Sequence, residues 1–261
     1  FYARDTRLHS LRPGRKRLLF FFHDIGMQCK IGSSALLGEL TMAILLFIGN
    51  QVFMRHLGDD GVGAFGVSCY YLPFVFMIGN AIAQSAQPII SYNHGLHETA
   101  RVRRAYLLAL KTAVGCGAIF AFITALFSSE IVSMFIDRSY PAYEIASKGL
   151  PLYATGFIFF AINIVSIGYF QSVERARYAT IITLLRGFVL LTACFFGLPL
   201  LFGNAGIWLA PPLAELLTTL FILIIYIKAK RERKENIVSL PHGNDDKEIL
   251  PKIQTSGKKP A

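Results

Sequence analysis

Long apolar segments alternate with short polar clusters along most of the chain. A helix that crosses a bilayer needs about 20 consecutive, mostly apolar residues. The segments that meet this length are 31–54, 64–91, 105–127, 149–171, 178–202 and 205–227. The pattern therefore predicts an all-α, polytopic membrane protein with six transmembrane helices, and the lipid bilayer is its expected surrounding.

Both ends of the chain are polar. Residues 1–30 are rich in Arg and Lys, and we interpret them as a cytoplasmic linker that follows a preceding helix. Residues 228–261 are polar and aperiodic, which is typical of a disordered basic tail. Because the chain begins with Phe1 and has no signal-peptide pattern, we expect it to be a fragment that starts within a longer protein.

The composition supports a membrane location. Hydrophobic residues make up 54% of the chain and charged residues only 16%, whereas about 25% of the residues in ordinary soluble domains are charged. The net charge of +10 comes from short clusters between the apolar segments, without the basic, aromatic-rich patch of a nucleic-acid-binding domain. We therefore expect no nucleic-acid partner.

The positions of Lys and Arg predict the orientation. They gather in residues 1–30, in the loops near 101–104 and 175–177, and at the start of the C-terminal tail, whereas the opposite side carries only Arg55, Arg138 and Lys148. Loops that are rich in Lys and Arg stay in the cytoplasm. Both ends of the chain are thus expected to be cytoplasmic, in a plasma membrane such as the bacterial inner membrane.

The sequence shows no catalytic or metal-binding pattern. The cysteines are far apart, the histidines lie in loops, helix ends or the tail, and none of them has the spacing of a metal site. Nucleotide-binding, hydrolase and metalloprotease motifs are absent from the sequence. We therefore expect neither an enzyme nor a cofactor.

The segment FMIGNAIAQSAQPIISYNHG (Phe76 to Gly95) places amides inside an apolar span. At about 100° per residue, Asn80, Gln84, Gln87 and Ser91 fall within a stripe about 60° wide. An unpaired amide in lipid costs several kcal/mol, so the stripe should face other helices or a hydrated cavity. Two interpretations stay open: hydrogen bonds that hold helices together, and the wall of a hydrophilic pathway.

Two acids lie within predicted spans. Glu39 is in the first span and Glu215 in the last, and an acid at such depth is a candidate proton or cation acceptor. Asn50 shares the face of Glu39 to within about 20°. The alternative for each acid is a structural hydrogen bond to a neighbouring helix.

Further polar residues occur in the later spans. Asn163 and Ser166 form an i,i+3 pair in the fourth span, and Arg186 in the fifth is expected to be structural or to pair with a Glu. Trp208 lies near the outer interface and is predicted to be an aromatic-belt anchor. A helical bundle with polar stripes and few acids is typical of a secondary transporter, whose binding site lies near the middle of the membrane.

Several segments resemble the multidrug and toxic compound extrusion (MATE) family: QPIISYNHG (Gln87 to Gly95), GYFQSVERARYATIITLLRG (Gly168 to Gly187) and GIWLAPPLAELL (Gly206 to Leu217). The resemblance implies that the chain is the C-terminal six-helix lobe of a twelve-helix transporter, with spans seven to twelve. Its partner would be an N-terminal six-helix lobe of the same protein.

The resemblance also implies a function: antiport coupled to H⁺ or Na⁺ that exports cationic, amphipathic drugs. Glu39 lies where Na⁺-coupled members carry an acid in span seven, whereas their span-ten Asp has no counterpart here and Asn163 is the nearest polar group. The cation-coupling candidates are Glu39, Glu215 and Asn163, and the pathway candidates are Asn50, Asn80, Gln84, Gln87, Ser91 and Ser166. The alternatives are a lipid-linked oligosaccharide flippase of the same superfold and a non-transporting membrane receptor or scaffold.

Overall fold

The computed structural model describes residues 15–238. Every regular element in this range is helical, which confirms the predicted all-α class. In chain order these elements are α1 (Arg15–Gly95), α2 (Thr99–Leu126), α3 (Ser128–Ser133), α4 (Pro141–Ala154), α5 (Phe157–Ser172), α6 (Ala176–Leu184), the π-helix η3 (Leu185–Leu190) and α7 (Leu191–Val238).

The helix α1 consists of two antiparallel segments that are joined at Gly58. This residue has φ 65° and ψ −157°, a backbone conformation that side chains with a Cβ rarely adopt. The chain folds back there, so the rings of Phe53 and Phe65 stack with their centroids 4.5 Å apart. The first two predicted spans, 31–54 and 64–91, lie on the two sides of this break.

The helix α7 is broken in the same way at Gly203, where φ is 55° and ψ is −136°. The predicted spans 178–202 and 205–227 lie on the two sides of this residue, the first of them starting in α6 and passing through η3. The break at Gly58 thus explains why α1 holds two predicted spans, and the break at Gly203 explains why α7 holds the end of one predicted span and the whole of the next.

The fourth predicted span, 149–171, is bent. It begins in α4 and continues through α5, and the axes of these two helices differ by 48°. Pro151 lies in α4 and lacks the backbone N–H that a continuous helix would use. A Cβ at Gly156, in the bend, would lie 2.8 Å from the Cα of Pro212, so a glycine there lets α5 and α7 approach closely.

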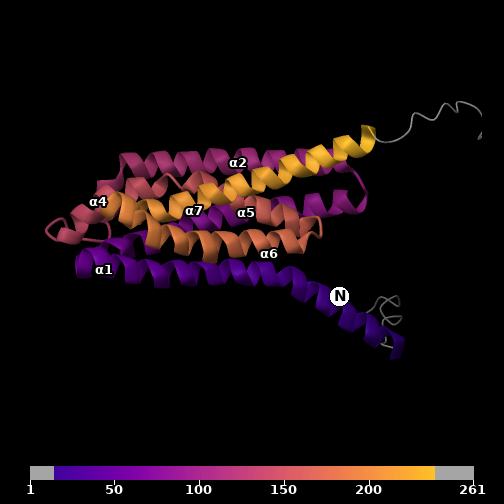
Figure 1. The fold of residues 1–261 in the computed structure, drawn as a ribbon, viewed down its shortest axis with the longest axis horizontal. Coiled ribbons are helices and arrows are strands. Elements are labelled where there is room, and N and C mark those ends of the chain that lie inside the picture. The colour runs from indigo at the N-terminus through magenta and orange to yellow at the C-terminus, as the bar shows by residue number, and fades with distance from the viewer. Residues whose placement is uncertain (1–14, 239–261) are drawn as a thin grey trace, which may run out of the picture. The chain divides into compact units, whose positions relative to one another are not determined.

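The chain divides into two compact units, Phe1–Leu223 and Ile224–Ala261. In the first, α5 packs against α1, α2 and α6, and α4 packs against α1, α2 and α3. Figure 1 shows α5 between α2 and α6. The described part of the second unit is the end of α7, which stays helical to Val238, and residues 239–261 of the predicted tail lie outside the described range.

Apolar helices of membrane-spanning length make up much of the described chain. They cover 39–95, 99–126 and 176–228, and the bent pair α4 and α5 has the composition of a fourth. Large apolar side chains such as Phe47, Met77 and Leu108 are exposed on their outer surface, which suits contact with lipid. α1 begins at Arg15, so part of the predicted linker 1–30 is helical, and residues 1–14 lie outside the described range.

The prediction for Trp208 is wrong. Its side chain is only 3% exposed and meets the rings of Phe53 and Tyr153 edge to face. A Cβ at Gly149 would collide with the indole, so this glycine leaves room for it in the core. Position near a span end suggested the interface, but the hairpin in α7 turns this face toward α1 and α4.

Candidate functional site

A buried ion pair joins η3 to α7. The Arg186 Nε donates a hydrogen bond to the Glu215 Oε1 over 2.7 Å, and the two side chains are only 6% and 12% exposed. The guanidinium also lies over the ring of Phe160, 4.6 Å from its centroid. Of the two roles predicted for Arg186, the structure shows the pairing with a Glu.

The other Glu215 oxygen is bonded to α5. The Asn163 Nδ2 donates to Oε2 over 2.7 Å and to the Glu215 backbone oxygen over 2.9 Å. The hydroxyl of Thr219 donates to the Asn163 Oδ1 over 2.9 Å. Two of the three cation-coupling candidates, Asn163 and Glu215, are therefore in direct contact, and a buried arginine completes their network.

The local backbone positions Arg186. It lies in η3, and a π-helical turn shifts side chains away from their α-helical direction; such turns are frequent at functional sites. The next residue, Gly187, packs directly against Thr41 of α1, where a Cβ would collide with the threonine side chain. η3 thus approaches α1 closely and presents the guanidinium to α5 and α7.

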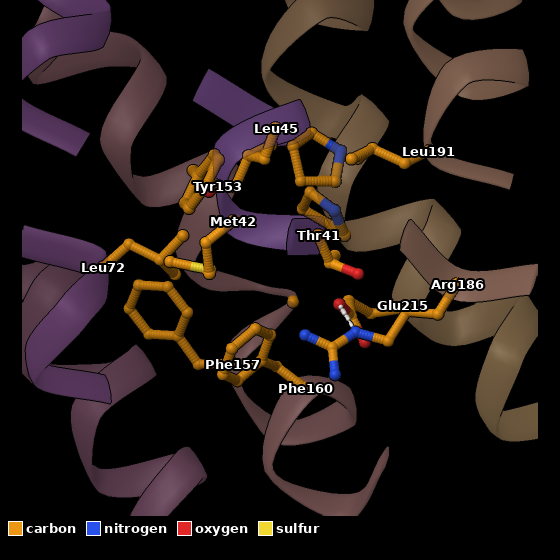
Figure 2. A pocket seen from close by; sticks show the side chains of 13 residues that line it. Thr41, Met42, Leu45, Leu72, Tyr153, Phe157, Phe160, Arg186, Leu191 and Glu215 are labelled. Carbon is orange, nitrogen blue, oxygen red and sulfur yellow. Dashed lines mark hydrogen bonds and ion pairs between the residues drawn. The ribbon is translucent and has the colours of Figure 1, made fainter. Parts of the chain in front are cut away.

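An inner cavity of about 30 Å³ adjoins this ion pair. Arg186 and Glu215 line one side of it, and Figure 2 shows Met42 and Leu72 on the other. The rest of the wall is largely apolar and includes Thr41, Tyr153, Phe157, Leu191, Pro211 and Pro212. The pair is therefore buried in protein but not sealed on every side.

An outer cavity of about 240 Å³ contains the third coupling candidate, Glu39. This side chain is exposed, and no described side chain forms a hydrogen bond or ion pair with it. The surrounding wall is apolar and aromatic and includes Phe65, Leu72, Pro73, Phe76 and Tyr153, together with Cys69. Glu39 is the acidic residue of this cavity, separate from the pair at Glu215.

The amide stripe is divided between two environments. The Gln87 Nε2 donates to the Gln171 Oε1 over 3.1 Å, and the Ser91 hydroxyl donates to the Ser172 backbone oxygen over 3.3 Å, so this end contacts α5. Asn80 is half-buried and Gln84 is exposed. None of the four lines either cavity.

The remaining pathway candidates are apart from these cavities as well. Ser166 is fully buried and shares a hydrogen bond of 2.9 Å with the hydroxyl of Tyr106, which ties α5 to α2. Asn50 is exposed on α1. Among the described residues, no three His, Cys, Asp or Glu side chains gather in a way that could hold a metal ion.

Sequence reasoning missed Met42 and Tyr153, which line both cavities. An apolar or aromatic residue in a span looks like any other core residue, and nothing in its spacing sets it apart. The one available signal for Tyr153 was its place between Pro151 and Gly156, where a helix is expected to bend.

The family model MatE matches residues 35–196. The chain belongs to the MatE family. This confirms the resemblance to the MATE transporters, and its relatives are transporters rather than enzymes.

Two curated relatives of this MatE chain have export or resistance functions in their names. The multidrug export protein MepA of Staphylococcus saprophyticus is 24% identical over 225 residues, 86% of this chain and 48% of MepA. The probable multidrug resistance protein NorM of Rhizobium meliloti is 25% identical over 171 residues, 63% of this chain and 37% of NorM. The chain thus spans about half the length of such relatives, or less.

Solved transporter structures share the fold. The MATE transporter VcmN of Vibrio cholerae has a TM-score of 0.75 and 16% identity, with 87% of this chain and 50% of VcmN covered. A MOP superfamily transporter from Pyrococcus furiosus has a TM-score of 0.72 and 19% identity, with 85% and 49% covered. The predicted fold class, one six-helix lobe of a MATE-like transporter, is confirmed.

Proposed function

We propose that this chain is one lobe of a cation-coupled antiporter that exports cationic, amphipathic compounds. The observation that carries the proposal is Glu39 in the outer cavity. A cavity of about 240 Å³ with one carboxylate and an aromatic wall suits a ligand that is both positively charged and apolar. The export function in the name of MepA supports the same direction of transport.

Glu39 can couple two cations because it can neutralise only one at a time. When a proton or Na⁺ is bound to its carboxylate, a cationic compound loses its counter-charge in the cavity. When the compound is bound, the coupling ion has no free carboxylate there. Mutually exclusive binding of this kind is what exchange across a membrane requires, with Glu215 and Asn163 as the further coupling candidates.

A second six-helix lobe is part of the proposal, because alternating access requires one lobe to rock against another. The orientation has its own support. The α1–α2 and α5–α6 loops lie at one end of the bundle, since Ile90, Val102 and Val173 pack together there. Arg101, Arg103, Arg104, Arg175 and Arg177 are all exposed near these loops, and this is the end that we place in the cytoplasm of a plasma membrane.

The flippase alternative is less well supported. A lipid pyrophosphate needs several free cations, whereas among the described residues the only Lys or Arg that lines either cavity is Arg186, which is paired with Glu215. A receptor or scaffold does not require an acid in an apolar cavity. Both alternatives predict that neutralising Glu39 leaves the export of a cationic dye unchanged.

The test is ethidium efflux from cells that express the full-length protein with Glu39→Gln. We expect efflux to fall several-fold while the protein level in the membrane stays the same. Glu130→Gln, at an exposed acid of α3 outside both cavities, is the matched control and should behave as the unmodified protein does. Equal efflux by both variants would refute the role of Glu39.

A further inference from the structure

The two cavities share a wall. Met42, Leu45, Leu72 and Tyr153 line both of them. Glu39 lines only the outer cavity, and Glu215 lines only the inner one. A single layer of apolar and aromatic side chains therefore separates the two acids.

Met42 is the least buried member of this wall. Leu45, Leu72 and Tyr153 are each at most 6% exposed and packed in the core, whereas Met42 is half-buried. A methionine side chain is unbranched, with three rotatable bonds, so it can change its conformation at little cost. Figure 2 places it between Leu72 and the side of the inner cavity where Arg186 and Glu215 lie.

The inner cavity is large enough for water, and its Arg186 and Glu215 side offers polar partners. The space open to the centre of a water molecule is about 30 Å³ in this cavity, and about 10–15 Å³ is enough to hold one water molecule. The guanidinium of Arg186 uses its Nε to bind Glu215, and no described residue accepts a hydrogen bond from its two Nη groups. Water in the cavity would satisfy these donors and would reach the Glu215 carboxylate.

We propose that Met42 is a gate on a water-filled route from Glu39 to the ion pair of Arg186 and Glu215, and that a proton uses this route. The proposal rests on the proposed cation coupling. In the step, the Glu39 carboxyl releases a proton to water, water passes a proton through the opened wall, and the Glu215 carboxylate accepts it. Arg186 keeps its charge, so the pair changes from neutral to a net charge of +1.

The groups around Glu215 determine what its protonation does to the ion pair. The charged or titratable groups that face it are Arg186 from η3 and Tyr153 from α4, with Glu39 and Cys69 of α1 across the wall, while α5 contributes the neutral Asn163. Within the described part of the chain, the inner cavity has no second carboxylate that could compensate the positive charge. A buried, uncompensated cation is unfavourable, so protonation of Glu215 favours separation of the pair and movement of α7 relative to η3.

Thiol labelling tests the gate. The native cysteines are replaced by serine or alanine in the full chain, and Thr41→Cys reports on the inner cavity, which Thr41 lines without lining the outer one. A chain that retains only Cys69 reports on the outer cavity. The probe is a small cationic methanethiosulfonate, and Leu191→Cys replaces Thr41→Cys if that variant does not assemble.

We expect Met42→Ala to raise the labelling rate at the inner cysteine about fivefold, the factor that a rotamer cost near 1 kcal/mol implies, and Met42→Phe to lower it. The rate at Cys69 should hardly change. Met77→Ala is the matched control, because Met77 belongs to the same helix but lies on the outer surface. An inner rate that is the same with Ala and Phe at position 42 would overturn the gate.

Infrared spectroscopy tests the proton. On acidification we expect a protonated-carboxyl band that is absent from the Glu215→Gln variant and from the doubly neutral Arg186→Met, Glu215→Gln variant. The band should appear faster with Met42→Ala and slower with Met42→Phe. No such band, or a band indifferent to Met42, would refute the route. Neither readout involves substrate, so failure here is distinct from unchanged ethidium efflux by Glu39→Gln.

Discussion

The guanidinium of Arg186 and the carboxylate of Glu215 lie on two antiparallel arms of one hairpin, with Nε and Oε1 2.7 Å apart. The arms are η3 with the start of α7, and the part of α7 that follows the break at Gly203. Because the pair has no net charge and is bonded to Asn163 of α5, it fixes three helical segments at once. Its low exposure means that each charge depends on the other.

Neutralising only one of the two residues should therefore lower the free energy of unfolding more than neutralising both. We expect Arg186→Met and Glu215→Gln each to lower the free energy of unfolding by about 3–5 kcal/mol, because each leaves one buried group without its counterpart. The doubly neutral variant should be more stable than the sum of the two losses predicts. Denaturant titration in detergent measures the stability of the unmodified protein, the two single variants and the double variant. Strictly additive losses would contradict the coupling.

Close contact between α2 and α5 depends on Gly117. A Cβ there would lie 2.9 Å from the Ile158 Cα and 3.0 Å from the Phe157 backbone oxygen, and neither backbone atom can move aside easily. We expect Gly117→Ala to lower the unfolding free energy by about 1–3 kcal/mol, the usual cost of overpacking.

The matched control for this prediction is Gly115→Ala in the same helix. Gly115 is exposed, and nothing lies within 4 Å of a Cβ built on it. Since alanine favours a helix more than glycine does, this substitution should leave stability unchanged or raise it by up to about 1 kcal/mol. A similar effect of both substitutions would show that helix propensity, and not contact with α5, decides the outcome.

The sequence alone predicted that the chain is helical and that Arg186 could pair with a Glu. These predictions depend on properties within one helix or between consecutive spans. Apolar length predicted the spans, and a period of 3.6 residues correctly placed Gln87 and Ser91 on one face, because both properties belong to a single helix. An acid and an arginine in neighbouring spans also suggested a pair, since a lone charge in the membrane is unfavourable.

Contacts between helices were beyond this kind of reasoning. Periodicity says which residues share a face but not which helix covers it, so Trp208 was assigned to the interface although it packs in the core. The shared wall of Met42 and Tyr153 depends on the bends near Gly58 and Gly156, which decide how α1 and α4 meet. Asn163 and Glu215 were separate candidates until the fold brought them together.

The amide stripe offers a direct comparison between its two interpretations. Gln87 is half-buried and bonded to Gln171 of α5, so it holds helices together, whereas Gln84 is exposed on the same face one turn earlier. We expect Gln87→Leu to lower the unfolding free energy by about 0.6 kcal/mol, the average for a hydrogen bond between membrane helices.

Gln84→Leu should leave stability unchanged and reduce ethidium efflux by the full-length protein, because a hydrophilic pathway loses part of its wall. The same denaturant titration and dye assay measure both variants. Normal efflux by Gln84→Leu would show that the stripe only holds the lobe together.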